Sequence, residues 1–481
     1  MTALTRSSSK QLFIYIVCGI GALTGFLFGF DSGVISGAIL FIKQQFHLTA
    51  GGQELVISVV LFGAIVGAVF SGRLSDYFGR QRLLLVSAVV FVIGTLISAY
   101  AGSVTTLVWG RLFLGAAIGV TSSVAPVYLS ELSPYEIRGA LIALYQLAIT
   151  LGIFVSYLID YAFSKSGAWH DMLGIGVIPA VILLFGLLFL PKSPRWLMAK
   201  GRASEAEKVL GKLREAHRVK DEINDIKSAI EEEGRANWKL LFSRWAMPAL
   251  VVAVGMAILQ QLVGINTIIY YGPTIFNVIG FKGAEGATAA AIIIGVVNVG
   301  ATFLGMYLID KLGRRPLVLM GLVLMIAGHL ILAWAFHYHH GMPAALRVFA
   351  LLGMISFIVG FAASLGIISW VLNAEVFPLK IRGLGSSMAA TSNWVFNALV
   401  SSTFLTLVHF FGESGTFFMY AIICCIGMVL VAIFMPETKG ITLERLEHNL
   451  HKGVSIRHLG DGPGAAHLTQ AEVDEVRAHD R

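Results

Sequence analysis

The stretch ELSPYEIRG at residues 131–139 recurs as EVFPLKIRG at residues 375–383, and both follow the pattern E-x-x-P-x-x-I-R-G. A second motif, D-x-x-G-R, occurs as DYFGR at 76–80 and as DKLGR at 310–314. Each motif falls at the same point in the order of hydrophobic segments in the two halves of the chain. Two motifs that recur in the same order indicate an internal repeat. We therefore expect two pseudo-symmetric halves, as in carriers whose halves rock about a central site.

The composition places both halves in a membrane. Of the 481 residues, 56% are hydrophobic and 13% are charged, with a mean hydropathy of +0.79. A soluble protein carries about 25% charged residues. Segments long enough to cross a bilayer, about 20 mostly apolar residues each, fall near 12–42, 53–73, 82–101, 106–130, 139–162, 170–190, 246–279, 287–309, 316–337, 346–375, 384–411 and 414–435.

These segments predict an all-α membrane protein with 12 transmembrane helices in two six-helix halves, together with a short intracellular helical domain. The predicted organisation is a first bundle at 1–190, a cytoplasmic linker at 191–245, a second bundle at 246–435 and a cytoplasmic tail at 436–481. The N-terminal apolar run is too long for a signal peptide, so we interpret it as the first span.

Basic residues predict the orientation. One side of the predicted membrane holds Arg73, Arg80, Arg82, Arg138, Lys311, Arg314, Arg315, Lys380 and Arg382, and the other holds Lys43, Lys165, Lys282 and Arg347. Positively charged loops stay in the cytoplasm, so both termini are expected to be cytoplasmic. The net charge of +7 is distributed over these loops, the insert and the tail, and it does not indicate a nucleic-acid partner.

The polar insert has two helical patterns. Acidic residues follow Ser204, as in the first turn of a helix, and apolar residues recur at helical spacing at Val209, Leu210 and Leu213, and again at Ile223, Ile226 and Ile230. We expect short amphipathic helices packed under the membrane domain. The alternative is a solvated run of charges.

Two charged residues lie in apolar segments. Asp31 is in the first predicted span and Arg111 is in the fourth. Ionisable side chains are costly in lipid, so they usually face a protein-lined interior and take part in function. Proton-linked transport needs at least an acidic side chain that can take up a proton and a basic side chain near it. The alternatives are that Asp31 is a solvated helix end and that Arg111 extends to the interface.

Amide and aromatic side chains in the spans suit a sugar. Amides donate and accept hydrogen bonds, and an aromatic ring covers the apolar face of a sugar. Gln260, Gln261, Asn266 and Tyr270 are in the seventh span, beside Gly264. Two adjacent glutamines are not expected to face one neighbour, which favours one of them lining a cavity. The alternative is that buried amides join helices by hydrogen bonds.

Four longer stretches are similar to the sugar porters of the major facilitator superfamily. They are GRLSDYFGR at 72–80, PKSPRWL at 191–197, QQLVGIN at 260–266 and PETKG at 436–440. The resemblance covers nearly the full length, and it is closest to bacterial galactose–proton, arabinose–proton and xylose–proton symporters.

The resemblance implies site residues. Those lining the sugar would be Gln146, Gln260, Gln261, Asn266, Asn298, Trp370, Asn393 and Trp394, with gate or wall aromatics Phe28 and Tyr271, and with Gly366 where the tenth helix approaches the sugar. Asn393, where relatives can carry Gln, favours a hexose. Motif positions predict a cytoplasmic latch of ion pairs made by Asp76, Arg80, Glu131, Arg138, Arg195, Asp310, Arg314, Arg315, Glu375, Arg382 and Glu437. The alternative for the arginines is that they only enforce topology.

The resemblance also gives the coupling hypothesis. Asp31 matches the acid that distinguishes proton symporters from passive facilitators, and Arg111 matches its basic partner. Asp31 would take up a proton in the outward-open state, and the neutral side chain would allow the loaded carrier to turn inward. The pair would then re-form and favour release of the proton.

Two departures from the family pattern stand out. Lys192 replaces the acid of the usual P-E-S-P-R motif, and we expect it to add repulsion near Arg314 and Arg315. The proline that usually precedes the tryptophan of the tenth helix is missing from the run Gly366 to Trp370. The bend of that helix is therefore in question.

The predicted function is proton-coupled symport of a monosaccharide, such as galactose, glucose, arabinose or xylose, in the bacterial inner membrane. No cofactor other than the proton, no metal and no enzymatic activity are expected, and the protein is expected to be monomeric. The alternatives are an inositol or polyol symporter, a passive sugar facilitator and a non-transporting sugar sensor.

Overall fold

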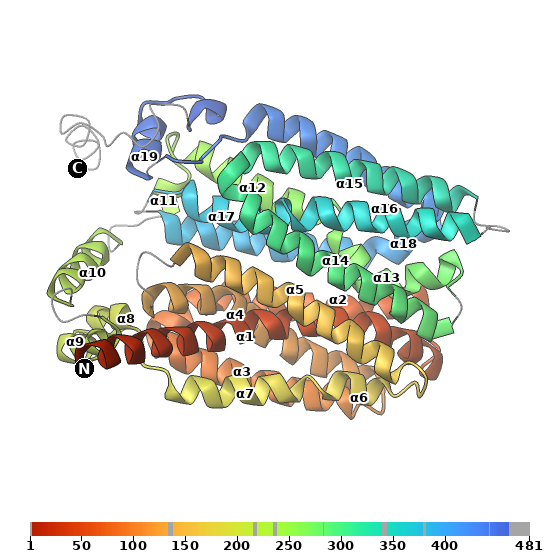
Figure 1. Cartoon of the computed structure of the whole chain (residues 1–481), viewed down its shortest axis with the longest axis horizontal. Helices are drawn as coiled ribbons and strands as arrows, with labels where there is room; N and C mark the ends of the chain where they lie inside the picture. Colours follow the sequence, from red (N-terminus) through yellow and green to blue (C-terminus); the bar gives the residue numbers. More distant parts are fainter. Residues whose placement is uncertain are drawn as a thin grey trace. The chain divides into compact units, whose positions relative to one another are not determined.

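The computed structural model describes residues 2–132, 138–214, 219–233, 238–281, 283–338, 344–378, 381–441 and 443–460. These residues form helices joined by short turns, with no strand among them (Figure 1). The all-α prediction is therefore confirmed. Residues 133–137 of the first repeat motif, Lys380 and the tail beyond 460 lie outside the described residues.

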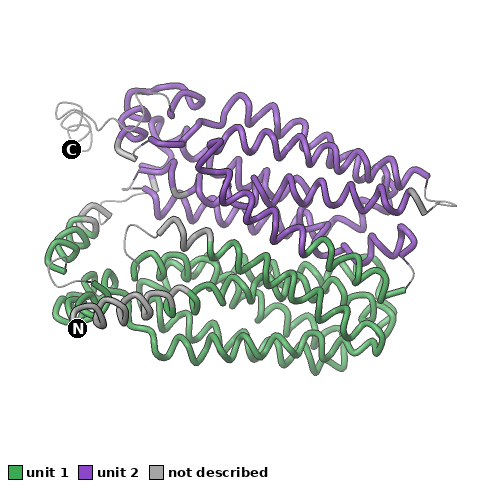
Figure 2. Tube along the Cα trace, in the orientation of Figure 1, with its two compact units in different colours: residues 1–234, 283–295 green, residues 235–282, 296–481 purple. Residues whose placement is uncertain are grey.

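The chain divides into two compact units (Figure 2). Unit 1 comprises residues 1–234 and 283–295, and unit 2 comprises residues 235–282 and 296–481. The helices of the first bundle in unit 1 are α1 (Thr2–Gln45), α2 (Ala50–Phe78), α3 (Arg80–Ala99), α4 (Val104–Leu132), α5 (Arg138–Phe163), α6 (Trp169–Gly174) and α7 (Val177–Phe189). The helices of the insert in unit 1 are α8 (Pro194–Ala199), α9 (Ala203–Leu213) and α10 (Val219–Glu233).

Unit 2 contains the second set of helices. They are α11 (Trp238–Leu241), α12 (Met247–Leu262), α13 (Ile265–Ile279), most of α14 (Gly283–Leu312), α15 (Arg314–His337), α16 (Ala344–Ala362), α17 (Leu365–Glu375), α18 (Arg382–Phe434), α19 (Leu443–His451) and a 3-10 turn (Ile456–His458). The first residues of α14 belong to unit 1.

The number of spans agrees with the prediction. Among the described residues, 11 helical segments are long and apolar enough to cross a membrane. The longest of them, α18, contains Gly412 with a non-helical backbone (φ 70°, ψ 167°). Because this residue divides α18 into two helices of spanning length, the segments correspond to twelve spans.

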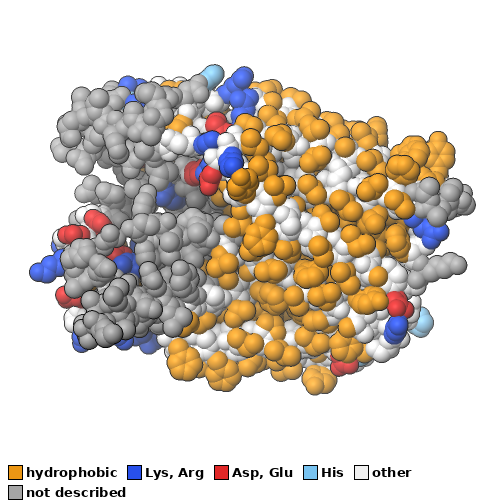
Figure 3. Space-filling model, in the orientation of Figure 1, with side chains coloured by type: hydrophobic (Ala, Val, Ile, Leu, Met, Phe, Trp, Pro, Cys, Tyr) orange, Lys and Arg blue, Asp and Glu red, His pale blue; other side chains and the backbone are white. Residues whose placement is uncertain are grey.

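Large apolar side chains are exposed on the long helices of each unit. In unit 1 they include Val66, Phe70, Ile182 and Phe185, and in unit 2 they include Phe303, Met320, Val323 and Ile433, each at least half exposed. In the space-filling view, orange hydrophobic side chains cover the bundles, and the charged side chains in view gather towards helix ends (Figure 3). Large exposed apolar patches mark a membrane or protein contact, and here they suit a lipid environment.

Glycines allow the helices of unit 1 to pack closely. Gly25, Gly29, Gly33 and Gly37 follow one another at four-residue intervals along one face of α1, against α5. A β-carbon on Gly29 would lie 1.9 Å from the carbonyl oxygen of Ile149. Small residues at this spacing let two membrane helices approach. The face of α1 that packs on α5 is thereby fixed.

Two spans of unit 2 are broken. The first break separates α12 from α13 at Gly264, which has φ 88° and packs against the ring of Tyr420. The second separates α16 from α17 at Ser364, with φ −130° and ψ −91°. The bend of the tenth span is thus present without the missing proline. Ser364 Oγ donates to Gly360 O at 2.6 Å, which satisfies a carbonyl near the break.

The polar insert forms the predicted helices, since α9 and α10 contain both apolar stripes. Trp196, Leu197 and Ala206 form a small buried cluster between α8 and α9. The indole of Trp196 donates to Asp76 O at 3.0 Å. The insert is therefore attached to the end of α2. The alternative of a solvated charge run is wrong for α9, where Leu210 and Leu213 are buried.

Candidate functional site

The predicted ion pair of unit 1 is present and buried. Asp31 on α1 is 4% exposed and Arg111 on α4 is 1% exposed. Arg111 Nη1 donates to Asp31 Oδ1 at 3.3 Å, and its Nε donates to the carbonyl of Val56 on α2 at 2.8 Å. This burial rules out both alternatives, a solvated helix end for Asp31 and an interfacial Arg111.

The geometry has an electrostatic consequence. Removing one member of a buried ion pair leaves an uncompensated charge, which typically costs about 3–5 kcal/mol. When Asp31 is ionised, Arg111 neutralises it. When Asp31 is protonated, the hydrogen bond of Arg111 to Val56 still holds the guanidinium at the junction of α2 and α4. Asp31 can therefore gain or lose a proton while the packing around the pair stays in place.

Unit 2 holds a connected cluster of amide side chains. Asn393 on α18 donates to Gln260 Oε1 at 2.6 Å and accepts from Gln261 Nε2 at 3.1 Å. Both glutamines therefore face one neighbour, and the expectation that they do not is wrong. An amide has a donor end and an acceptor end. Each end of Asn393 is hydrogen-bonded to one of the two glutamines at the end of α12.

The amide cluster connects the two helix breaks of unit 2. Gln260 Nε2 donates to the carbonyl of Leu365, the first residue of α17, at 3.0 Å. Asn266, one residue into α13, donates to Gln261 Oε1 at 2.5 Å. Discontinuous helices surround the substrate in many carriers, because their free backbone groups and small residues can contact it. Four predicted sugar residues are thus assembled into one network.

The other predicted sugar residues of unit 2 are placed as follows. Tyr271 donates its hydroxyl to Ser401 O at 2.8 Å, and its ring lies 4.9 Å from that of Phe404. Asn298 on α14 is 4% exposed, and Trp394 on α18 is 3% exposed. Trp370 on α17 is half-buried. A β-carbon on Gly366 would lie 3.2 Å from the ring of Phe361.

Two predicted sugar residues belong to unit 1. Phe28 on α1 and Gln146 on α5 are both half-buried. Phe28 lies one helical turn before Asp31, so one helix carries both a proposed sugar contact and the proposed proton site.

The predicted latch of unit 1 is assembled around Arg80. This residue lies 3.0 Å from Asp76 and 3.3 Å from Glu131 by their nearest charged atoms. The side chain of Asp76 is 73% exposed, whereas that of Glu131 is 5% exposed. Exposed ion pairs contribute little, so the Glu131 contact is the more informative one.

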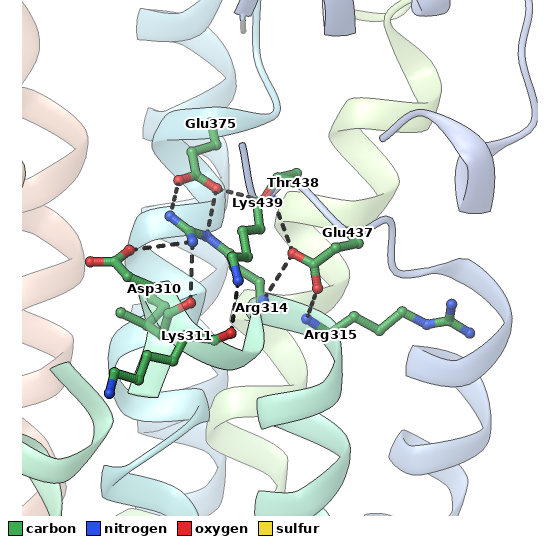
Figure 4. Close-up of polar contacts among 9 residues, drawn as sticks. Asp310, Lys311, Arg314, Arg315, Glu375, Glu437, Thr438 and Lys439 are labelled. Carbon is green, nitrogen blue, oxygen red and sulfur yellow. Dashed lines mark hydrogen bonds and ion pairs between the residues drawn. The ribbon is translucent and has the colours of Figure 1, made fainter. Parts of the chain in front are cut away.

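The corresponding latch in unit 2 is better bonded. Arg314 makes a two-pronged contact with Glu375, from Nη2 to Oε1 at 2.8 Å and from Nε to Oε2 at 3.3 Å. Asp310 lies 3.6 Å away, and Thr438 donates to Glu375 at 2.6 Å. Figure 4 shows Arg314 between the two acids. The repeat motifs therefore place an arginine and an acid together in each unit.

Glu437 acts differently from the prediction of side-chain ion pairing. Its carboxylate accepts the backbone N–H groups of Arg314 at 2.9 Å and Arg315 at 3.0 Å (Figure 4). These are the first N–H groups of α15, which have no acceptor within the helix. The guanidinium of Arg315 donates instead to Ala432 O at 2.5 Å.

The three further predicted latch residues are Arg382, Arg195 and Arg138. Arg382 Nε donates to Phe377 O at 3.2 Å, on its own repeat motif. Arg195 is half-buried on α8. Arg138 begins α5, but its side chain lies outside the part of the chain that the structure describes.

Several buried charged residues of the described chain were missed by the sequence analysis, among them Asp160 and Arg214. Asp160 on α5 is fully buried, and its Oδ2 accepts the Gly37 N–H at 3.1 Å. Arg214 binds both oxygens of Glu222, at 2.7 and 2.9 Å, and donates to Leu132 O at 3.0 Å, which attaches the insert to the end of α4. An acid within the 139–162 span was a signal for Asp160, by the argument used for Asp31. No motif marked Arg214.

The sequence is similar to those of known proteins over nearly the whole chain. The family model described as "Sugar (and other) transporter" matches residues 17–450. The galactose-proton symporter of Escherichia coli K12 is 42% identical over 461 residues, which cover 95% of this chain and 98% of that protein. The arabinose-proton symporter of the same strain is 39% identical over 443 residues, which cover 91% and 94%.

A solved structure agrees with the fold. The major facilitator superfamily proton:xylose symporter XylE, bound to 6-bromo-6-deoxy-D-glucose, superposes with a TM-score of 0.78 at 31% identity. The superposition covers 90% of this chain and 98% of that one. With spans, repeat motifs and both broken helices in place, the chain belongs to the sugar transporter family of the major facilitator superfamily.

Proposed function

We propose that this protein is a proton-coupled monosaccharide symporter that works by alternating access. The observation that carries the proposal is the buried Asp31–Arg111 pair in a member of the sugar transporter family. The relatives named as galactose–proton and arabinose–proton symporters support it, as does the structural similarity to a proton:xylose symporter.

The charge on Asp31 supplies the coupling. Ionised Asp31 is bound to Arg111 and holds α1 against α4. A proton on Asp31 removes the negative charge, weakens this attraction and lets α1 move relative to α4. If sugar binding favours the protonated form, the loaded carrier and the empty carrier change conformation at different proton occupancies. A ligand shifts such an equilibrium only through its different affinity for the two states.

The sugar would bind by exchanging hydrogen bonds. The amides of Gln260, Gln261, Asn266 and Asn393 satisfy one another. Buried polar groups require partners, and sugar hydroxyls can take the place of these partners without a net loss of hydrogen bonds. Tyr271, Trp370 and Trp394 would supply apolar surface for the ring, with Asn298, Gly366, Phe28 and Gln146 as further contacts.

The cellular setting is proposed on the same basis. The protein would be a multi-pass protein of the bacterial inner membrane with both termini in the cytoplasm, acting as a monomer without enzymatic activity. The basic residues of the short loops support this orientation. The substrate would be a hexose such as galactose or glucose, or a pentose such as arabinose or xylose.

The test uses purified protein in liposomes. Sugar-evoked current is recorded for galactose, glucose, arabinose, xylose and inositol, with wild type and Asp31→Asn. A current that disappears in Asp31→Asn while sugar exchange remains supports symport and ranks the substrates. A current only with inositol would identify a polyol symporter, exchange without current a facilitator, and neither signal would favour a sensor.

A further inference from the structure

Unit 1 contains a small cavity beside the Asp31–Arg111 pair. Its volume, counted as the space open to the centre of a water molecule, is about 10 Å³, roughly what one buried water needs. The polar residues lining it are Asp31, Thr95, Ser98 and Arg111, and the other lining residues are apolar or glycine. All four polar residues are less than 5% exposed. The cavity is therefore lined by buried side chains, with polar groups from three helices.

Two polar atoms of these lining residues lack a partner. Ser98 Oγ and Arg111 Nη2 are buried without a hydrogen-bond partner among the described residues. Nearby buried hydroxyls on the same helix do have partners, because Ser87 donates to Leu83 O at 2.9 Å and Thr95 donates to Phe91 O at 2.8 Å. Buried polar groups in proteins are nearly always bonded to protein or to ordered water. A polar ligand in the cavity would satisfy both atoms.

The packing of α3 on α4 keeps Ser98 at this place. A β-carbon on Gly110 would lie 2.5 Å from Ser98 Oγ, and one on Gly94 would lie 2.8 Å from the backbone nitrogen of Leu114. The two glycines thus let α3 and α4 approach closely. Because Gly110 directly precedes Arg111, the hydroxyl lies next to the helical turn that carries the guanidinium.

One lining residue of the cavity, Ser98, is close in sequence to an exposed turn. Ser98 is in the last turn of α3, two residues before Tyr100, which is 82% exposed. Arg111 is seven residues into α4, about 10 Å from its first residue. Ser98 is thus the cavity residue nearest to the turn at 100–103 along the chain. The turn, the cavity and Asp31 all belong to unit 1, whereas the amide cluster belongs to unit 2.

We propose that one water molecule occupies this cavity, held by Ser98 Oγ, Arg111 Nη2 and the carboxylate of Asp31, and that it relays the coupled proton. The water passes one of its protons to an Asp31 oxygen and receives one from the Ser98 hydroxyl, which is reprotonated from solvent at the turn. One proton moves, and Ser98 and the water end as they began. This inference rests on the proposed symport and adds Ser98 as a residue of its proton path.

Other charged or titratable groups surround this path. Besides Asp31 on α1 and Arg111 on α4, Glu54 lies on α2, two residues from Val56, and His170 lies on α6. His170 Nδ1 is 2.7 Å from the carbonyl of Ala99, beside Ser98. The uptake assay therefore includes a His170→Gln variant, which tests whether the imidazole rather than Ser98 delivers the proton.

The test separates proton-driven uptake from proton-independent exchange. Ser98→Ala removes the hydroxyl and keeps the helix, and Ser87→Ala is the matched control, since Ser87 is buried on α3 and bonds its own helix. We expect Ser98→Ala to lower the initial rate of proton-driven uptake roughly a hundredfold, the low end of what one positioned proton-transfer group contributes. Sugar counterflow should stay within about twofold, and Ser87→Ala should change neither rate.

A second readout distinguishes a relay from packing. Uptake by wild type in D₂O should be slowed more than counterflow, and Ser98→Thr, which keeps a hydroxyl, should restore part of the rate lost in Ser98→Ala. Equal losses of uptake and counterflow in Ser98→Ala, or no loss in either, would overturn the inference. If wild type itself shows no proton-coupled uptake, the proposed function fails first, and the inference fails with it.

Discussion

The carboxylate of Glu437 accepts the backbone N–H of Arg314 at 2.9 Å and so caps the N-terminus of α15. The repeat gives the same position in unit 1 to Lys192, because PKS at 191–193 corresponds to PET at 436–438. Leu190, which ends α7 two residues before Lys192, lies against the start of α3, because its carbonyl accepts from the side chain of Gln81 at 2.5 Å. A lysine carries no acceptor, and a cation is unfavourable at a helix N-terminus.

Lys192→Glu should therefore stabilise unit 1. A carboxylate at this position can accept the first N–H groups of α3, and a gained cap contributes about 0.5–2 kcal/mol. The measurement is the melting temperature of the purified protein in detergent. The matched variant Glu437→Lys should lower it. A melting temperature of Lys192→Glu at or below that of wild type would show that the pseudo-symmetric cap does not form.

Arg111→Gln should destabilise the protein more than Asp31→Asn does. The first change leaves a buried carboxylate without its cation, at a typical cost of about 3–5 kcal/mol, unless that carboxylate takes up a proton. The second leaves Arg111 with its hydrogen bond to Val56 O. The double variant should recover part of the loss, as measured by denaturation midpoints. Additive losses in the double variant would mean that the two side chains are not energetically coupled.

Gln261→Ala should weaken sugar binding without unfolding the protein. The change removes one donor to Asn393 and one acceptor for Asn266, and a net hydrogen bond contributes about 0.5–1.5 kcal/mol. We expect the apparent affinity in a transport assay to fall about tenfold. Gln53→Ala, at the start of α2, is the control. An unchanged affinity in Gln261→Ala would remove this residue from the sugar site.

Gly29→Ala should disturb the contact of α1 with α5. Its β-carbon would lie 1.9 Å from the carbonyl oxygen of Ile149, so the backbone of one helix must shift, at a cost of about 1–3 kcal/mol. Gly19→Ala in the same helix meets nothing within 4 Å and should be tolerated. The readout is the melting temperature of both variants. Equal stability of the two would show that α1 and α5 are not held this closely.

Much of the fold follows from local sequence features. Twelve spans are predictable because a span requires only length and apolarity, which are properties of consecutive residues. Asp31 and Arg111 stand out for the same reason, since a charge in an apolar run is visible without knowing its neighbours. Asp160 satisfied the same criterion and was overlooked. The break before α17 was in doubt because it depends on Ser364 and on close packing rather than on proline.

The sequence by itself determined that this chain is a two-fold repeat of membrane helices with an acid, a cation and a set of amides in the spans. Only the tertiary structure decided which groups meet. Asn393 bonds both Gln260 and Gln261 across more than 130 residues of chain, and Glu437 bonds backbone N–H groups rather than a guanidinium. Hydropathy sets where a helix runs, whereas its rotation and depth against its neighbours come from side-chain packing, and these set every hydrogen bond between helices.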